Sequence, residues 1–398
     1  MSAAILNTAE SSFTPRRGHY YLDRWMLFAV ISLLSIGYVM VVSASLHLGE
    51  RVFDDIWHYP LRQAGHIVIG LLMALLMAKT PLSVWEKSGP SLILIAIGLL
   101  VLVFIPGIGV KVNGSYRWIN LGVARLQVSE VVKLICLLYM AGFLTRHVDD
   151  VRASIKSVFR LILPLGLVFA LLLAEPDFGA AFVIGFSVIC MMFMGGARLV
   201  EFVVLVLVGV GLGVLAIVSS AYRMERVTAF MDPWADHLGS GFQLTQSLIA
   251  MGRGEWFGVG LGSSIQKLFY LPEAHTDFIF AVLGEELGFA GSCSVILLFG
   301  LLVWRVFQMG KAAERLNLRF DSLLAYGLGV WIGLQSFVNI AVNIGALPTK
   351  GLTLPFMSYG GSSMIVMCMV AGLLCRVHHE TQLDLEDQMK GSSSWQYA

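Results

Sequence analysis

Long apolar runs separated by short polar segments form the main pattern of this chain. Ten runs approach or reach the roughly 20 residues that a membrane-spanning helix needs. They cover residues 24–46, 61–79, 90–106, 127–145, 158–174, 178–195, 199–220, 277–307, 321–345 and 360–377. The pattern predicts an all-α, polytopic integral membrane protein with about ten transmembrane helices. The first run is too long for the apolar core of a signal peptide, which has about 7–15 residues, so we assign it to the first helix.

The polar segments divide the chain into three predicted parts. Residues 1–23 form an N-terminal tail, residues 24–377 the membrane domain, and residues 378–398 a charged C-terminal tail. The longest connection within the membrane domain is the loop over residues 221–276. Apolar residues between Phe242 and Met251 favour one helical face. We therefore expect a helix within this loop that lies at the membrane surface or re-enters the membrane.

Charge bias gives the expected orientation. Ten helices place both termini on one side, and more of the 27 lysines and arginines flank that side than the other. Basic residues favour the cytoplasmic side of a membrane, so both termini are predicted to be cytoplasmic. The segments left on the external side are residues 106–127, 175–179, 221–276 and 346–363. Because the cytoplasmic loops are short, any chemistry is expected outside.

Composition supports a membrane protein and excludes some functions. Hydrophobic residues make up 57% of the chain and charged residues only 13%, with a mean hydropathy of +0.78. A net charge of +1 provides no electrostatic basis for binding nucleic acid. The five cysteines all fall in apolar runs, without metal or redox spacing, and are interpreted as packing residues.

The strongest candidate for chemistry is Asp277, where a polar loop becomes apolar. An acid at this position can simply stabilise the beginning of a helix. Glu285 follows on nearly the same helical face, and two such acids fit a catalytic or ion-binding line better than a cap. Glu285 and Glu286 are expected to lie deeper than a lipid headgroup reaches. Burial would raise the pKa of Asp277 and a nearby cation would lower it, and the sequence leaves the balance open.

Lys350 is the second candidate, in an external segment stiffened by Pro348 and Pro355. A lysine here can be an interfacial anchor. Several hydroxyl side chains crowd around it, including those of Ser358 and Ser362, and this favours a contact with pyrophosphate.

Other external polar residues are weaker candidates for substrate binding. The arginines can form a basic surface for an anionic headgroup or act as interface anchors. Glu175 and Asp177 flank Pro176 and either form a turn or line the same acidic cavity. His275 is either a proton relay or a hydrogen-bonded structural residue. The four arginines are Arg117, Arg125, Arg223 and Arg226.

Metal and cofactor signals are sparse. No carboxylate and histidine cluster has reliable metal spacing, so no cofactor is firmly expected. A divalent cation, Mg or Mn, that bridges an acid and a pyrophosphate is left open.

Several stretches carry a resemblance to a known family. They read PEAHTDFIFA at Pro272–Ala281, GEELG at Gly284–Gly288, LPTKGLTLPFMSYGGSS at Leu347–Ser363, YRMERVTAF at Tyr222–Phe230 and GFQLTQS at Gly241–Ser247, with RWI at Arg117–Ile119 and EPDFG at Glu175–Gly179. Through them the chain resembles the SEDS family of bacterial cell-wall proteins, and most closely its cell-division members, from about residue 20 to 380.

The resemblance implies a fold, an activity and partners. It implies a ten-helix protein of the bacterial inner membrane that polymerises lipid II, a polyprenyl-pyrophosphate disaccharide-pentapeptide, into peptidoglycan at the division septum. Asp277 matches the family's essential acid. The implied partners are a class B penicillin-binding protein, which is a transpeptidase, and other membrane proteins of the divisome.

These residues suggest a mechanism and two rivals. In the mechanism, Asp277 takes the proton of the acceptor 4-hydroxyl as it attacks the donor anomeric carbon. Lys350, with Arg117 or Arg223 nearby, stabilises the departing pyrophosphate, alone or with a divalent ion. A lipid II flippase is the alternative, with Lys133, Glu285 and Glu286 along a translocation path. A non-catalytic septal scaffold is the third reading. Charges cluster at the external face, which favours the enzyme.

Overall fold

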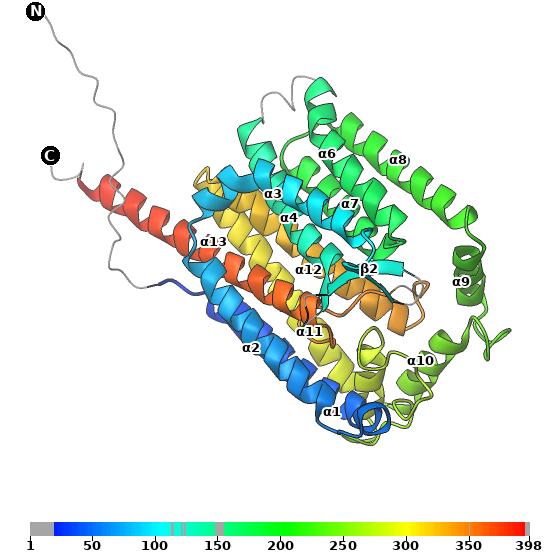
Figure 1. The fold of residues 1–398 in the computed structure, drawn as a ribbon. Helices are drawn as coiled ribbons and strands as arrows, with labels where there is room; N and C mark the ends of the chain where they lie inside the picture. The colour runs from blue at the N-terminus through cyan, green and yellow to red at the C-terminus, as the bar shows by residue number, and fades with distance from the viewer. Residues whose placement is uncertain are drawn as a thin grey trace, which may run out of the picture.

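The computed structural model describes residues 20–112, 115–120, 122, 125–147, 155–349 and 351–394 of this chain. Helices dominate it and a small sheet accompanies them (Figure 1). The helices are α1 (Arg24–Phe53), α2 (His58–Lys79), α3 (Leu82–Val103), α4 (Val128–Arg146), α6 (Ile155–Ala174), α7 (Phe178–Met194), α8 (Leu199–Val218), α9 (Ala221–Met231), α10 (Phe242–Arg253), α11 (Ile279–Arg315), α12 (Arg319–Asn343) and α13 (Gly361–Ser394). The strands are β1 (Gly109–Val112), β2 (Ser115–Asn120) and β3 (Arg125–Gln127).

Each of the ten predicted spans corresponds to one helix, which confirms a polytopic helical membrane protein. Among the residues that the structure describes, seven helices are long and apolar enough to cross a membrane, and shorter apolar stretches lie in α6, α7 and α8. Several boundaries differ from the prediction, those of α3 and α13 among them. Helix α3 begins at Leu82 and contains Pro90, which the sequence pattern had placed at its start. Helix α13 continues through the charged segment to Ser394.

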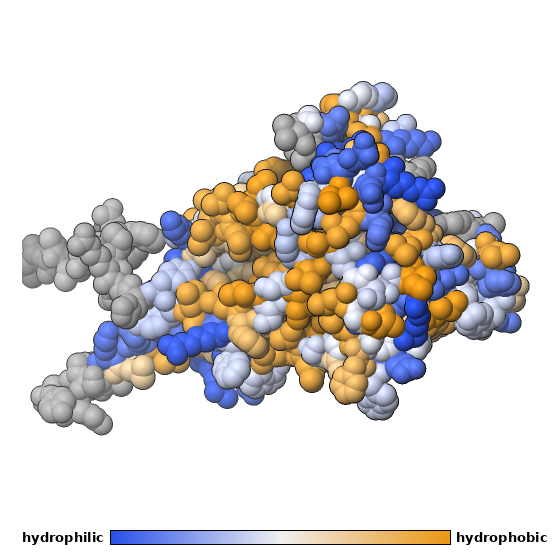
Figure 2. All heavy atoms as spheres, turned by 90° about the horizontal axis from the view of Figure 1, so that it is seen from below, coloured by the Kyte–Doolittle hydropathy of each residue, from blue (hydrophilic) through white to orange (hydrophobic). Residues whose placement is uncertain are grey.

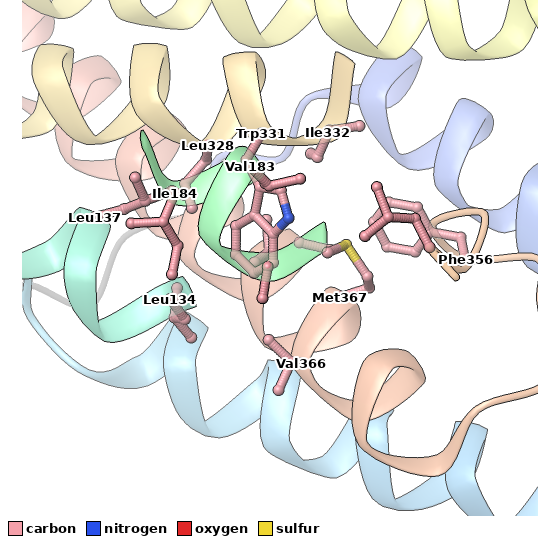
Figure 3. Close-up of a cluster of buried hydrophobic side chains, with 14 of the residues drawn as sticks. Leu134, Leu137, Val183, Ile184, Leu328, Trp331, Ile332, Phe356, Val366 and Met367 are labelled. Atoms are coloured by element: carbon pink, nitrogen blue, oxygen red, sulfur yellow. The ribbon is translucent and has the colours of Figure 1, made fainter. Parts of the chain in front are cut away.

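The centre of the bundle is α4, which is buried along nearly its whole length. It packs against α3, α7, α12 and α13. Figure 3 shows the side chains that gather around Trp331 of α12, including Leu134 of α4 and Val183 of α7. Lipid is as apolar as these side chains, so close van der Waals packing, rather than exclusion of water, holds the helices together in a membrane.

The two ends of the bundle differ. Figure 1 shows both termini at one end, and strand β2 and helices α9 and α10 toward the other. We call the second the sheet end; it carries β1–β3, α9, α10 and the loop over residues 254–278. Figure 2 shows hydrophobic residues across the middle of one face and hydrophilic residues gathered toward its ends, as expected for a protein that spans a membrane.

The small sheet was not predicted from the sequence. Its order is β1-β2-β3, with antiparallel pairs such as Gly109 with Ile119 and Trp118 with Gln127. The sheet pairs backbone groups of its three strands within the connection between α3 and α4. Because β3 ends at Gln127 and α4 begins at Val128, the sheet joins directly to the most buried helix.

Helix α11 is broken at Gly288, where φ is 68° and ψ is −163°. A break inside a membrane is tolerated only where the freed backbone groups find partners. The loop after α10 supplies them: the N–H groups of Val259 and Gly260 donate to the carbonyls of Glu285 and Glu286, and those of Phe289 and Ala290 donate to the carbonyls of Glu255 and Trp256. A Cβ at Gly254 or Gly258 would collide with α11 backbone, so glycine permits this close crossing.

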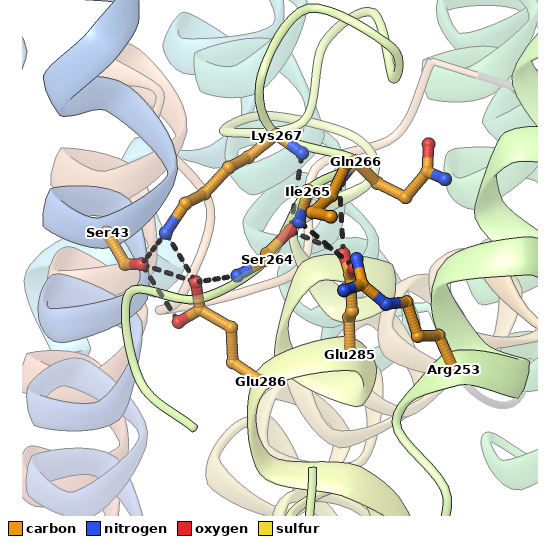
Figure 4. Close-up of polar contacts among 8 residues, drawn as sticks. All are labelled: Ser43, Arg253, Ser264, Ile265, Gln266, Lys267, Glu285 and Glu286. Atoms are coloured by element: carbon orange, nitrogen blue, oxygen red, sulfur yellow. Dashed lines mark hydrogen bonds and ion pairs between the residues drawn. The ribbon is translucent and has the colours of Figure 1, made fainter. Parts of the chain in front are cut away.

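Two fully buried acids fasten the same loop to α11 (Figure 4). Glu285 pairs with Arg253 at 3.0 Å, and Glu286 pairs with Lys267 at 2.6 Å. Ser43 of α1 donates to Glu286 at 2.7 Å, and Ser264 donates to Glu285. We call these six residues the buried clamp. The expected line of acids does not form, because α11 begins only at Ile279 and the Glu285 carboxylate is occupied by the loop.

Candidate active site

Asp277 lies in the turn just before α11, at the sheet end. Its backbone carbonyl accepts hydrogen bonds from Asn339 at 2.9 Å and from Asn343 at 3.0 Å. The Asn343 side chain also accepts from the N–H of Ala281 at 3.0 Å. Helix α12 therefore fixes both the turn that carries the acid and the first turn of α11.

One polar face of α12 connects two loops. Gln335, Asn339 and Asn343 are four residues apart, so they share a face of the helix. Gln335 donates to the carbonyl of Thr353 at 2.9 Å, and Asn339 donates to that of Leu352 at 2.6 Å. These three residues were not predicted from the sequence, although polar side chains at this spacing in an apolar helix are the signal that reveals them.

We expect Asn339→Ala to lower the free energy of unfolding by about 1–3 kcal/mol, because the carbonyls of Asp277 and Leu352 each lose a donor. The turnover number should fall as well, since the Asp277 turn loses a support. Denaturation of the purified protein in detergent measures the first effect. Ser294→Ala, which removes an exposed local bond on α11, is the control. Equal stability of the two variants would contradict the assigned role of Asn339.

The loop over residues 351–360 packs against the Asp277 turn. Ser358 donates to the carbonyl of Thr276 at 2.7 Å, and the N–H of Tyr359 donates to the carbonyl of His275 at 2.9 Å. A Cβ at Gly351 would lie 3.2 Å from Oδ2 of Asp277, so the carboxyl group lies against this loop. Lys350, the neighbour of Gly351, lies outside the described residues.

The hydroxyls predicted to bind substrate are engaged with the protein. Ser358 also accepts from the N–H of Leu354 at 2.7 Å, and Ser362 accepts from the N–H of Gln127 at 2.8 Å. Both serines are buried. In this structure they position the loop and the end of β3, so their binding of substrate stays a prediction.

Two arginines act on Asp277 electrostatically. Arg226 of α9 donates to the carbonyl of Thr349 at 3.0 Å, beside Lys350 in the chain. Arg117 of β2 donates to the carbonyls of Glu175 and Pro176, at 3.2 and 2.6 Å. Both positive charges favour the ionised form of Asp277. Residues from β2, α9 and two loops thus meet around one acid.

The remaining two arginines differ. Arg223 lies over the ring of Phe178, with its guanidinium carbon 3.6 Å from the ring centroid, next to the Glu175–Asp177 turn. Arg125 is exposed, and its carbonyl accepts a bond from Ser362 at 3.4 Å. The basic surface predicted from the sequence is therefore partly assembled, with Arg117, Arg223 and Arg226 around the acidic turns.

The pKa of Asp277 is raised to about 7. Burial is the largest cause, and the charge of Glu273 raises it further, while Arg226 and Arg117 lower it. Desolvation therefore outweighs the cations, which answers the question that the sequence left open. Glu273 was not predicted from the sequence either; it is exposed, has a φ of 56° and accepts a bond from the Thr276 hydroxyl.

The acids of the turn between α6 and α7 have different environments. Asp177 caps α7 by accepting from the N–H of Ala180 at 3.1 Å. Glu175 is buried, and both of its carboxyl oxygens are without a hydrogen-bond partner among the described residues. Burial, and then the charge of Asp177, raise the pKa of Glu175 to about 8, against the influence of Arg117.

His275 lies among aromatic rings. Its ring centroid is 5.1 Å from that of Tyr59 and 5.4 Å from that of Tyr359. Burial lowers its pKa, against the charge of Glu273, so the neutral imidazole predominates at pH 7. These contacts show a packed ring that joins α2 to the Asp277 turn.

The fold and site together define a class: a polytopic helical membrane protein with a desolvated acid, Asp277, at one end of its bundle. The loops around this acid are held by the polar face of α12. Residues 24–383 match the family described as cell cycle protein, of the FtsW, RodA and SpoVE type. The chain belongs to this family, the SEDS family.

Individual relatives agree with this assignment. The chain is 53% identical over 363 residues to the "Probable peptidoglycan glycosyltransferase FtsW" of Methylococcus capsulatus, covering 91% of each chain. It is 54% identical to the protein of the same name from Thioalkalivibrio sulfidiphilus, covering 90% of each chain.

Solved structures share the fold. One chain comes from a structure described as "Structural coordination of polymerization and crosslinking by a peptidoglycan synthase complex". It has a TM-score of 0.70 and 30% identity, with coverage of 91% of this chain and 99% of that chain. The rod shape determining protein RodA of Thermus thermophilus has a TM-score of 0.65 and 28% identity, with coverage of 90% and 97%.

Proposed function

We propose that this protein is a peptidoglycan glycosyltransferase that polymerises lipid II, with Asp277 as the general base. The observation that carries the proposal is the desolvated carboxyl group of Asp277, whose pKa of about 7 suits proton transfer near neutral pH. Relatives about half identical over nearly the whole chain carry that enzyme name.

The reaction needs one base and a stabilised leaving group. The acceptor 4-hydroxyl oxygen forms a bond to the anomeric carbon of the donor, Asp277 takes the hydroxyl proton, and the bond from that carbon to the pyrophosphate oxygen breaks. The pyrophosphate leaves with the electron pair and needs no proton once its charge is stabilised. Arg117, Arg226 and Lys350 are proposed to supply that stabilisation.

A divalent cation, Mg or Mn, is compatible with this chemistry but has a limited donor set. No group of three His, Cys, Asp or Glu side chains that could hold a metal occurs among the described residues. Mg²⁺ is often held by one or two carboxylates together with substrate phosphates. We propose that any cation here would be bound by Asp277 together with the pyrophosphate.

We propose that the sheet end faces the outside of the inner membrane at the division septum, with both termini in the cytoplasm. Basic residues favour the terminal side, as the positive-inside rule requires. The proposed partners are a class B penicillin-binding protein and other divisome membrane proteins. A solved relative described as part of a peptidoglycan synthase complex supports the first of these.

A flippase is the second candidate, because a charged pair lies deep in the bundle. Lys133 and Glu130 of α4 are buried and 2.9 Å apart. Lys133 also donates to Gln335 at 2.9 Å and lies 5.1 Å from the centroid of the Trp331 ring. These contacts form a packed network rather than an open path, so the enzyme is favoured.

The test is polymerisation of purified lipid II by the purified protein, alone and with its transpeptidase partner. We expect glycan polymer, detected by gel separation of labelled product. Movement of labelled lipid II across vesicle membranes without any polymer, under both conditions, would contradict the enzyme and support the flippase.

The rate should depend on pH through Asp277. A base acts in its ionised form, so the rate should rise with pH through about 7 and level off above it. At two pH units below the pKa, about one hundredth of the base is ionised. Glu273→Gln removes a charge that raises this pKa, so the midpoint of its rate profile should move to lower pH. An unchanged midpoint would assign the titration to another group.

A further inference from the structure

A pocket of about 310 Å³ lies at the sheet end, beside the candidate active site. Helix α9 contributes Glu225 and Arg226 to its lining, and the beginning of α10 contributes Phe242 and Gln243. The mechanism proposed above uses only Arg226 from this group. That mechanism assigns the remaining lining residues neither to proton transfer nor to the leaving pyrophosphate.

The pocket shares a wall with the site of Asp277. Thr349 lines it, accepts a bond from Arg226 at 3.0 Å, and precedes Lys350 in the chain. Pro272 also lines it and begins the segment that leads to Asp277. A molecule in the pocket would therefore lie next to the reacting groups without occupying their place.

The loop before α10 also lines the pocket, through Gly239 and Ser240. Ser240 donates to the carboxylate of Asp236 from its N–H at 2.8 Å and from its hydroxyl at 3.0 Å. The hydroxyl of Thr245 donates to the carbonyl of Pro233 at 3.0 Å. A Cβ at Gly239 would collide with the Asp236 carboxylate, so the loop is tightly closed around that acid. The wall is thus formed before any ligand arrives, which lowers the entropic cost of binding.

The chemistry of the lining excludes several ligands. The Arg226 guanidinium is assigned above to the departing pyrophosphate, and the neighbouring carboxylate of Glu225 repels anions, so the pocket does not suit a second phosphate. Its polar side chains do not suit a polyprenyl chain. Its volume is at the lower end of the range of about 300–1,000 Å³ for small-molecule sites, enough for about one sugar ring.

What suits the pocket is a neutral ring with polar edges and an apolar face. The amide of Gln243 can both donate and accept, and the Ser240 hydroxyl, which donates to Asp236, keeps lone pairs as acceptors. Phe242 and Pro272 offer apolar surfaces for the C–H face of a ring. An acetamido sugar combines an amide, hydroxyls and such a face.

We propose that this pocket is a subsite for an acetamido sugar of the glycan strand, beside the bond being formed. The inference rests on the proposed function, because that function supplies a substrate built from acetamido sugars. Holding the strand beside Asp277 between additions would favour repeated additions to the same chain over release.

The direct test measures binding without turnover. Purified full-length protein carrying Asp277→Asn is titrated with tetra-N-acetylchitotetraose, with cellotetraose, which lacks acetamido groups, as the comparison. We expect the acetamido oligosaccharide to bind more tightly. Adding Gln243→Ala or Phe242→Ala should weaken binding by about fivefold or more, since each removes a polar or ring contact. Glu255→Gln, an exposed acid outside this pocket, is the matched control and should leave binding unchanged.

A second readout uses the active protein. Gln243→Ala and Phe242→Leu should shorten the glycan strands at least twofold while the initial rate stays within about twofold, because the reacting groups are untouched. If the pocket instead holds only a sugar of lipid II, both variants should show a raised KM for lipid II and an unchanged strand length. That result would overturn the assignment of the pocket to the glycan strand. Equal oligosaccharide binding by the variants and their parent would overturn the pocket itself. Absence of polymer from the wild-type protein would overturn the proposed function, whereas the binding titration would still report on the pocket.

Discussion

Asp277→Asn is expected to abolish polymerisation while binding of lipid II is retained. Asparagine has nearly the same shape, so the turn held by Asn339 and Asn343 should persist, because those bonds go to the backbone carbonyl. It cannot take up the hydroxyl proton. Loss of a general base costs about 10²–10⁴-fold in rate. Product formation from labelled lipid II measures the rate, and binding of lipid II to the same purified variant measures retention.

Glu273→Gln is the matched control for this prediction. It removes an acid four residues away, in the same segment, that is exposed and makes a local contact with Thr276. This variant should remain active above pH 7, where Asp277 is ionised in either background. Full polymerisation by Asp277→Asn would end the assignment of the base, whatever Glu273→Gln does.

Lys267→Met is expected to cause the largest loss of stability. Lys267 and Glu286 are almost completely buried and are 2.6 Å apart in the buried clamp (Figure 4). Removing the lysine leaves a carboxylate buried without its counter-charge, at a cost of about 3–5 kcal/mol. Ser43 still donates to this carboxylate but carries no charge. Thermal or chemical denaturation of the purified protein in detergent measures the loss.

Two controls separate the buried pair from charge in general. Lys390→Ala disrupts an exposed ion pair of α13, 3.6 Å long, and should cost less than about 1 kcal/mol. The double variant Lys267→Met with Glu286→Leu removes both charges and should recover a large part of the stability. If the double variant were as unstable as the sum of both single changes, the two residues would not be coupled.

Loosening of the clamp should also affect catalysis, because the loop that it holds leads to the acid. Lys267 lies ten positions before Asp277, and Glu286 lies on the first part of α11, between Asp277 and the break at Gly288. The clamp therefore fixes both sides of the Asp277 turn. Its charges are used for structure, so a negative charge inside a membrane protein need not mark a substrate path.

Much of the candidate site was predicted from the sequence because its motifs are local. Asp277 was identified from its place between a polar loop and an apolar run, and Arg117 and Arg226 from their place in loops on the same side. The structure brings these three together. The motif with Lys350 was expected beside Asp277, and its neighbour Gly351 lies there.

Other site features depend on contacts between distant segments. Nothing near Glu285 or Glu286 in the chain indicates that Arg253 and Lys267 would pair with them. The hydroxyl of Ser358 was interpreted as a ligand for pyrophosphate, and only the structure shows that it also bonds to the backbone of Thr276. Whether a polar side chain serves the protein or a substrate depends on which backbone groups lie opposite it, and sequence patterns do not contain that information.

The sequence by itself determined the helical membrane class and the approximate positions of the apolar helices, because about 20 apolar residues in a row have few alternatives to crossing a membrane. It also determined which acid is the candidate base. The tertiary structure alone decided the ionisation of Asp277, since burial and the charges of Glu273, Arg226 and Arg117 act through space. It alone revealed the β-sheet, the break in α11 and the buried clamp, because each is formed by groups that are separated along the chain and meet only in the folded bundle.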